Sequence, residues 1–125
     1  MSTRSSKDKD WRYDASVIEV LDGDTIRVSV DLGFHVFMRV DVRVAGINAP
    51  EKNTPAGVAA KEHASKLLPV GAGIVLDTEK PEASDKYGRW LAQVTFGGPT
   101  PSNFGFVMVA AGHAKVWDGH GLKPV

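Results

Sequence analysis

Hydrophobic and polar residues alternate along three consecutive stretches between positions 15 and 45, and short turn signals separate these stretches. The first stretch, ASVIEVL at 15–21, ends at DGD at 22–24, and the second, TIRVSV at 25–30, ends at a DLG sequence. Alternation of period two places side chains on opposite faces of a strand, and Asp-Gly pairs are typical of tight hairpin turns. The pattern therefore predicts a three-stranded antiparallel meander.

The third stretch is the longest, and its two faces differ in character. One face is apolar and consists of Val36, Met38, Val40, Val42 and Val44. The other face carries Arg39, Asp41, Arg43 and Ala45. We expect the apolar face to be buried and Arg43 to lie on the opposite face.

The rest of the chain predicts two helices and two further strands. Thr54-Pro55 is a typical helix start, followed by apolar residues at helical spacing until Pro69 and Gly71. Short apolar runs predict strands at 74–76 and 90–96. Ser102 or Asn103 is a candidate cap for a second helix that ends before Gly112.

The order β-β-β-α-β-β-α is the plan of a five-stranded barrel of the OB type, mainly β with two helices. A mixed sheet remains the alternative on pattern alone. The chain has 125 residues, which suits one domain. We expect a flexible N-terminal arm at 1–12, the OB-fold domain at 13–120 and a tail at 121–125.

Composition excludes several classes of protein. The hydrophobic and charged fractions, 42% and 24%, are those of a soluble domain, and no apolar run approaches the roughly 20 residues of a membrane-spanning helix. The absence of cysteine excludes disulfides, thiolate zinc sites and cysteine nucleophiles. The polar N-terminus is no secretory leader, so we expect an intracellular, cytoplasmic protein that contacts no membrane and needs no obligate protein partner. Fifteen basic side chains oppose fifteen acidic ones, so any attraction for a polyanion must be local.

Four polar stretches lie at the ends of predicted strands or beside them. They are DGDT at 22–25, Arg43, Glu51 and DKYGR at 85–89. The DGDT and DKYGR sequences, and the NAPE sequence that ends at Glu51, are each typical of turns. Arg43 on a regularly patterned strand, with Glu51 soon after it, instead favours a catalytic site. Phosphodiester hydrolysis suits this set, because guanidinium groups neutralise the charge of the transition state and a carboxylate can position water. A hard cation would bind Asp24 and neighbouring oxygens.

Three ordered motifs resemble the staphylococcal nuclease (thermonuclease) family. They are VLDGDTIRV at 20–28, VRVAGINAPE at 42–51 and DKYGRWLAQV at 85–94. The segment AAGHAKVW at 110–117 is also similar, so the resemblance extends from about Val17 to Trp117.

The resemblance implies a calcium-dependent OB-fold endonuclease that binds one ion and cleaves DNA and RNA to products with 3′-phosphates. A groove of this type is expected to prefer single strands. The resemblance implies that Asp24, Asn48 and the Ala49 carbonyl hold the ion, with Asp22 as a supporting carboxylate. It implies further that Arg43 and Arg89 bind the phosphate, that Glu51 orients or deprotonates water, and that Lys86 and Tyr87 hold the phosphates of the bound nucleotide.

The chain also departs from the family pattern. Asn48 stands where the family usually has an aspartate, so we expect weak calcium affinity. The segment between Glu51 and the first helix is short, and the chain ends too soon after Trp117 for the family's additional C-terminal helix. The alternative function is a non-catalytic OB module that binds nucleic acid or protein through a weakened metal site.

The remaining conspicuous side chains suggest structural roles. Trp90 and Phe96 alternate with apolar residues and are expected in the core, and Trp117 either covers the barrel end or stacks on a base. His63 is expected to be a structural histidine. A metal site formed by His113, Asp118 and His120 is a minor alternative.

Overall fold

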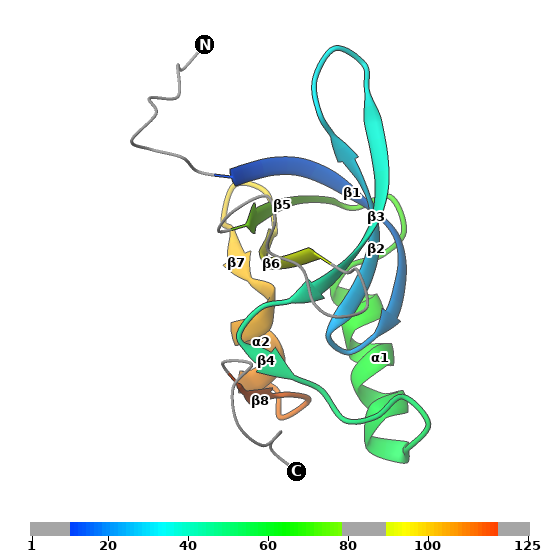
Figure 1. Ribbon diagram of the computed structural model, residues 1–125. Helices are drawn as coiled ribbons and strands as arrows, with labels where there is room; N and C mark the ends of the chain where they lie inside the picture. The colour runs from blue at the N-terminus through cyan, green and yellow to red at the C-terminus, as the bar shows by residue number, and fades with distance from the viewer. Residues whose placement is uncertain (1–10, 79–89, 118–125) are drawn as a thin grey trace.

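The computed structural model describes residues 11–78 and 90–117. Figure 1 shows a barrel of long strands with two helices on one side of it. The elements are β1 (Trp11–Asp22), β2 (Thr25–Asp31), β3 (Phe37–Val44), β4 (Ile47–Asn48), α1 (Pro55–Leu67), β5 (Gly73–Thr78), β6 (Trp90–Phe96), β7 (Ser102–Asn103), α2 (Phe104–Ala110) and β8 (Lys115–Val116).

The five long strands close into a barrel. β1, β2 and β3 form the predicted antiparallel meander, β5 pairs with the other edge of β1, and β6 pairs with β5. Closure comes from a parallel pairing between β3 and β6, in which Val42 lies opposite Trp90 and Val44 opposite Ala92. The prediction of a five-stranded OB-type barrel with two helices is confirmed.

The barrel interior is filled by branched aliphatic side chains, and the helices add the remaining core. Val28, Val42, Val44 and Val94 are fully buried. The helix α1 supplies the small side chains of Ala60 and Ala64, and α2 supplies Phe104 and Met108. Both helices therefore lie against the barrel and hold the loops between strands in place.

The predicted helix starts are also confirmed. The Thr54 hydroxyl accepts a hydrogen bond from the Gly57 N–H at 3.0 Å, and Pro55 is the first residue of α1. The Asn103 side chain accepts from the Phe106 N–H at 2.9 Å at the start of α2. Both contacts satisfy backbone donors that a helix leaves unpaired in its first turn.

The structure corrects the prediction for the third strand. Only its second half is buried, whereas Val36 and Met38 are exposed and Val36 precedes the strand. The reason is visible in Figure 1, where the hairpin of β2 and β3 extends beyond the barrel. The alternation of apolar and polar residues predicts which face of a strand is apolar, but it does not predict how much of that face the rest of the barrel covers.

Other differences concern the ends of elements and the predicted core. β1 begins at Trp11, so the last two residues of the predicted arm belong to the barrel, and residues 1–10 lie outside the described ranges. The short strands β4 and β7 were not predicted. Trp90 is partly buried and lines one mouth of the barrel, and Phe96 packs edge-on against Phe104. Neither described helix is long and apolar enough to cross a membrane.

Candidate functional site

The turn between β1 and β2 brings Asp22 and Asp24 together. The Asp24 N–H donates to Asp22 Oδ1 at 3.1 Å, which fixes the turn. Gly23 lies between them in a tight space, because a Cβ there would lie 2.8 Å from the Cβ of Ala49 and 2.9 Å from that of Ala60. The turn is therefore clamped between α1 and the segment that follows β4.

The Asp24 carboxylate is buried and contacts Ala49, Arg43 and Thr25. Its Oδ2 accepts a hydrogen bond from the Ala49 N–H at 2.7 Å and lies 3.4 Å from the Arg43 guanidinium. Its Oδ1 accepts from the Thr25 hydroxyl at 3.2 Å. These contacts join two segments that are distant in sequence and place Asn48 and Ala49 beside Asp24.

Arg43 lies near the end of β3, opposite Thr25 in β2, and is also buried. Its Nη1 donates to the Val44 carbonyl at 2.8 Å, and its Nη2 lies 3.4 Å from Asn48 Oδ1 as well as from Asp24. The guanidinium carbon lies 6.0 Å from the centre of the Trp117 ring, within the range of a cation–π interaction. The guanidinium group is therefore held in one position before any ligand arrives.

Burial controls the protonation of the two aspartates. Desolvation, with help from the neighbouring Asp22, raises the pKa of Asp24 from 3.8 to about 6, although Arg43 and the Ala49 N–H act against this. Burial also raises the pKa of Asp22, but hydrogen bonds from Asp24 and Thr25 outweigh it, so the pKa of Asp22 lies below its ordinary value. Without a further cation, one proton therefore stays in this pair, on Asp24, in mildly acidic solution.

Hydrogen bonds to its main-chain carbonyl fix the position of Glu51. Its carbonyl accepts hydrogen bonds from the Thr54 N–H at 3.0 Å and from the Thr54 hydroxyl at 2.7 Å, directly before α1. Its side chain is exposed, and no hydrogen bond or ion pair joins it to Asp24 or Arg43 among the described residues. The carboxylate thus stands in solvent on a loop whose backbone is fixed.

Of the residues predicted for the site, the fold brings together Asp22, Asp24, Arg43, Asn48 and Ala49. Glu51 follows this cluster by two positions in the chain. Lys86, Tyr87 and Arg89 lie outside the described residues.

Sequence reasoning gave no role to Thr25, whose hydroxyl binds Asp24, or to Gly23, whose lack of a side chain allows the close packing. It expected Trp117 at the barrel end or against a base, whereas its ring lies over Arg43. Thr25 stands inside the DGDT motif and could have been singled out there. Trp117 is placed by the pairing of β4 with β8, and its N–H donates to the Gly46 carbonyl at 2.8 Å. A pairing of two residues leaves no detectable signal in a sequence.

The donor atoms in this cluster fit a hard cation. The side chains of Asp22, Asp24 and Asn48 supply carboxylate and amide oxygens, which are the ligand atoms that calcium and magnesium prefer. The charge is modest, since within residues 11–78 and 90–117 no three acidic, histidine or cysteine side chains gather closely enough to hold a metal. The residues therefore suit a weakly held divalent ion.

Comparison with known proteins agrees with this arrangement. A family model described as staphylococcal nuclease homologue matches residues 41–122, from the middle of β3 past β8. The chain belongs to the staphylococcal nuclease family. The match includes Arg43, Asn48, Ala49 and Glu51 but begins after the Asp22–Asp24 turn.

Two curated relatives extend the similarity through that turn. An uncharacterized endonuclease of Escherichia coli O157:H7 is 33% identical over 109 residues, which cover 87% of this chain. The protein ParB of Escherichia coli is 35% identical over 111 residues, which cover 84% of this chain. The alignments take in 64% and 58% of these two relatives, so the chain spans less than two thirds of their length.

The histidines show a different arrangement from the one considered as a metal site. The rings of His63 in α1 and His113 after α2 lie against each other, with centres 4.7 Å apart. This contact ties the two helical segments together, in line with a structural role for His63. Asp118 and His120 lie outside the described residues.

Proposed function

We propose that this chain is a calcium-dependent endonuclease that hydrolyses phosphodiester bonds in DNA and RNA and leaves 3′-phosphates. The observation that supports this best is the buried guanidinium of Arg43, held beside the Asp24 carboxylate in a chain of the staphylococcal nuclease family. A rigid guanidinium next to oxygen ligands for a cation suits a reaction in which negative charge grows on phosphate oxygens.

In this mechanism Arg43 donates paired hydrogen bonds to the phosphate. The guanidinium is planar and permanently charged, and its position is already fixed by Val44 and Asn48, so little reorganisation is needed when charge develops. Arg89 is the second phosphate-binding arginine of the proposal, and Lys86 and Tyr87 hold the other phosphates of the nucleotide.

Glu51 is the proposed general base. Its exposed carboxylate can accept a proton from water, and the hydrogen bonds from Thr54 hold its backbone at a constant position. Asp24, Asn48 and the Ala49 carbonyl would hold the calcium ion, with Asp22 supporting Asp24. When bound, the ion would stabilise charge on the phosphate and make water more acidic.

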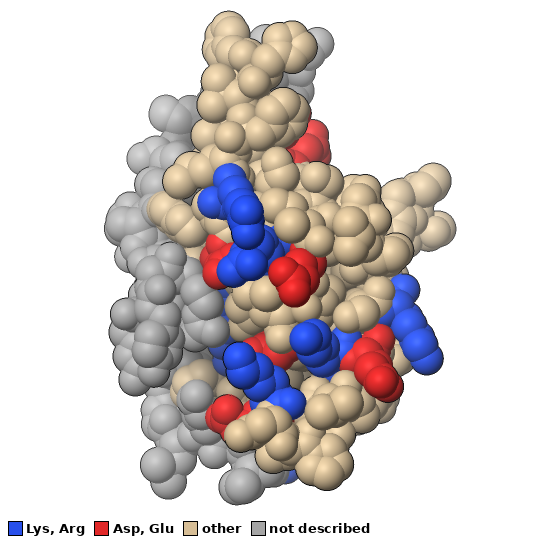
Figure 2. Space-filling view, turned by 90° about the vertical axis from the view of Figure 1, so that its right-hand side faces the viewer, with Lys and Arg blue, Asp and Glu red and all other residues tan. Residues whose placement is uncertain are grey.

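Single-stranded nucleic acid is the preferred substrate in this proposal. The face of the molecule in Figure 2 mixes acidic and basic side chains below an uncharged knob, and Arg27 is neutralised by Asp41 at 2.8 Å and Glu19 at 3.6 Å. On this face the charges of both signs do not form the continuous basic surface that suits the phosphate backbone of a duplex. A single strand can instead bend its backbone toward the local cluster around Arg43.

One observation favours the alternative of a non-catalytic binding module. Asn48 supplies an amide oxygen where a second carboxylate would raise the affinity for calcium. The two functions are separated by incubating a single-stranded DNA with the protein in calcium and then in excess chelator. Cleavage that occurs with calcium and not with excess chelator supports the calcium-dependent endonuclease. Cleavage in both conditions, or binding without cleavage, contradicts it.

Replacing Glu51 by Gln tests the role of the base. The amide cannot accept the proton, so we expect turnover to fall by roughly 10²–10⁴-fold while the affinity for a non-cleavable oligonucleotide is unchanged. Glu62→Gln in α1, an exposed position outside the site, is the matched control and should act normally. If the Glu51 variant instead lost affinity at full turnover, Glu51 would be a binding residue.

A further inference from the structure

The hairpin between β2 and β3 ends in an exposed apolar segment, here called the hairpin tip, which comprises residues 32–38. Its exposed large side chains are Leu32, Phe34, Val36, Phe37 and Met38. Phe34 is 98% exposed, and the tip contains no Lys, Arg, Asp or Glu. It forms the uncharged knob at the top of Figure 2. A surface of this kind on a small domain marks a place of contact with another molecule.

The backbone of the hairpin tip holds Phe34 away from its own barrel. Gly33, Phe34 and His35 have φ values of 85°, 55° and 62°, and two of these residues are not glycine. The left-handed region costs a bulky residue of the L configuration free energy. Hydrogen bonds within the loop maintain the conformation, including one from the Val36 N–H to the Gly33 carbonyl at 2.9 Å. The strained turn therefore presents a ring that nothing in the described chain covers.

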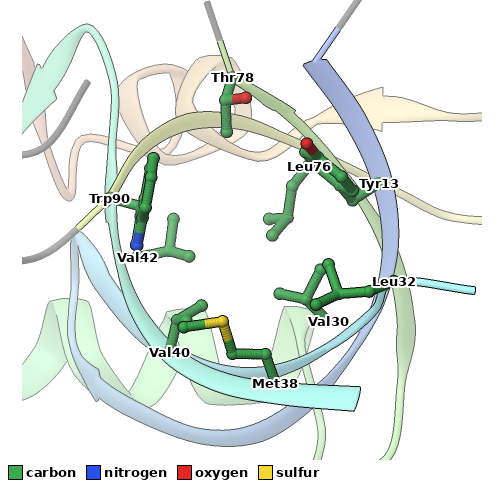
Figure 3. A pocket seen from close by; sticks show the side chains of 9 residues that line it. All are labelled: Tyr13, Val30, Leu32, Met38, Val40, Val42, Leu76, Thr78 and Trp90. Atoms are coloured by element: carbon green, nitrogen blue, oxygen red, sulfur yellow. The ribbon is translucent and has the colours of Figure 1, made fainter. Parts of the chain in front are cut away.

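A pocket of about 120 Å³ opens at the base of the same hairpin. Figure 3 shows it at the mouth of the barrel, with side chains from several strands pointing into it. Its walls include Tyr13, Val30, Val40, Leu76 and Trp90, and its edge is formed by Leu32 and Met38 of the hairpin tip. An apolar cavity of about 150 Å³ can hold benzene, so this pocket is slightly smaller than such a cavity and can take up most of one aromatic ring.

We propose that two copies of this chain associate through their hairpin tips, with the Phe34 ring of each copy seated in the barrel mouth of the other. A ring that is exposed and a pocket that can take up most of it lie on one continuous surface, because Leu32 and Met38 belong to both. A surface that carries both partners of a contact is self-complementary under a twofold axis.

The area and the charges of this surface agree with a dimer. A fully exposed aromatic side chain offers roughly 150–250 Å², so the five apolar side chains together present on the order of 500 Å², against about 800 Å² per partner in a standard interface. The pocket walls add little to this, so two tips would bury on the order of 1,000 Å² in total, which is the lower end of the range for specific interfaces. Asp31 and Arg39 border the tip, and both are exposed. One charge of each sign therefore borders each tip, so two tips can meet without an excess of like charge.

The test is sedimentation velocity of the full chain over increasing protein concentration, for the wild type, Phe34→Ser and Phe106→Ser. Phe106 is the matched control, because it is a 73% exposed phenylalanine on α2, away from the hairpin. Each dimer loses two buried rings in the first variant, so we expect its dissociation constant to rise at least about 100-fold. The Phe106 variant should dimerise like the wild type.

The pocket side is tested separately with Val40→Phe, which fills the mouth from within. We expect this variant to remain folded by its thermal melting curve and to be monomeric, and its mixture with Phe34→Ser to form a heterodimer through one remaining insertion. Dimerisation should also change the fluorescence of Trp90, and Trp90→Phe identifies that signal. A wild type that is monomeric at every concentration, or a dimer that survives Phe34→Ser, overturns the proposal. So does a monomer whose affinity for single-stranded DNA falls in Phe34→Ser, because the hairpin tip would then contact nucleic acid.

Discussion

At the scale of single residues, the protonation of Asp24 links the site to the stability of the whole chain. In the folded protein its pKa is raised to about 6, whereas the ordinary value that applies to the unfolded chain is 3.8. Between these values the folded state binds the extra proton, so the free energy of unfolding falls as the pH rises from about 4 through 6. Asp22, whose pKa is lowered, acts in the opposite direction and only below its ordinary pKa.

We predict that Asp24→Asn raises the stability of the protein in chelator at pH 7 but not at pH 4. The gain in the free energy of unfolding is at most about 3 kcal/mol, because the pKa of Asp24 rises from 3.8 to about 6 on folding and each pKa unit corresponds to about 1.4 kcal/mol. Urea unfolding at several pH values measures it, and Asp14→Asn, an exposed aspartate in β1, is the control. A pH-independent difference between the Asp24 variant and the wild type would show that folding does not raise the pKa of Asp24.

Arg43→Lys is predicted to keep the charge and lose the planar fork. Because the loss of one preorganised donor costs roughly 3–4 kcal/mol in the transition state, turnover should fall about 10²–10³-fold. Circular dichroism should show a folded protein, since a lysine ammonium can still pair with Asp24. The exposed Arg39→Lys variant on the same strand should keep full turnover. Normal turnover in the Arg43 variant would mean that Arg43 does not touch the reacting phosphate.

Asn48→Asp is predicted to strengthen calcium binding. The added carboxylate supplies the charge that the cluster lacks, although it must be desolvated and it repels Asp24. We expect a net gain of roughly 5–150-fold in affinity, or about 1–3 kcal/mol. Calorimetric titration measures it, with Asn53→Asp on the exposed loop nearby as the control for added charge alone. Identical curves for the Asn48 variant and the wild type would exclude Asn48 as a ligand.

Motifs reveal the types of residue in this site but not their contacts. The DGDT and GINAPE sequences predicted Asp24, Asn48 and Ala49, and the fold does bring them together. That Arg43 would be buried and paired with Asp24 could not be predicted, because burial depends on what β8 and Trp117 place over the strand. The catalytic and metal-binding roles of Asp24, Arg43, Asn48 and Ala49 remain predictions.

At the scale of elements, the start of α1 fixes the loop that carries Glu51. A Cβ on Gly57 would lie 1.8 Å from the Glu51 carbonyl oxygen and 2.9 Å from the Lys52 Cα, and neither is a flexible side-chain atom. The same carbonyl binds Thr54, which caps the helix. The helix and the loop can therefore approach only where residue 57 has no side chain.

We predict that Gly57→Ala destabilises the protein by about 1–3 kcal/mol despite the better helix propensity of alanine. The Glu51 loop must move away from α1, so turnover should fall as well. Gly73→Ala is the matched control, because nothing lies within 4 Å of a Cβ there and its effect on both measurements should be small. Equal stability of the two variants would show that the loop yields without cost.

Elements with a strong periodic or capping signal were predictable, and those held by a few contacts were not. Thr54-Pro55 and the pair Ser102-Asn103 predicted the two helix starts, because capping is a local interaction, and the structure shows that Asn103 is the second cap. The two-residue strands β4 and β8 depend on a pairing across the chain. The extension of the β2–β3 hairpin beyond the barrel follows from the lengths of the other strands.

At the scale of the whole molecule, the barrel was predicted from the order of its elements. Alternation and turn signals predicted the meander, and the helix between the third and fourth strands indicated an OB-type closure. The pairing of β3 with β6 itself left no signal, since it involves only a few residues on each strand. Such a closure depends on the twist and length of every strand together.

The parallel closure also sets an order of events during folding. The meander of β1, β2 and β3 needs only neighbouring segments, but Val42 can meet Trp90 only after α1 and β5 have been made. During synthesis on the ribosome, one edge of β3 therefore stays unpaired until β6 has emerged. An unpaired strand edge can pair with other chains and so promote aggregation. The exposed Arg39 lies on this strand, and a charged side chain on an unpaired edge opposes such association while the nascent chain is incomplete.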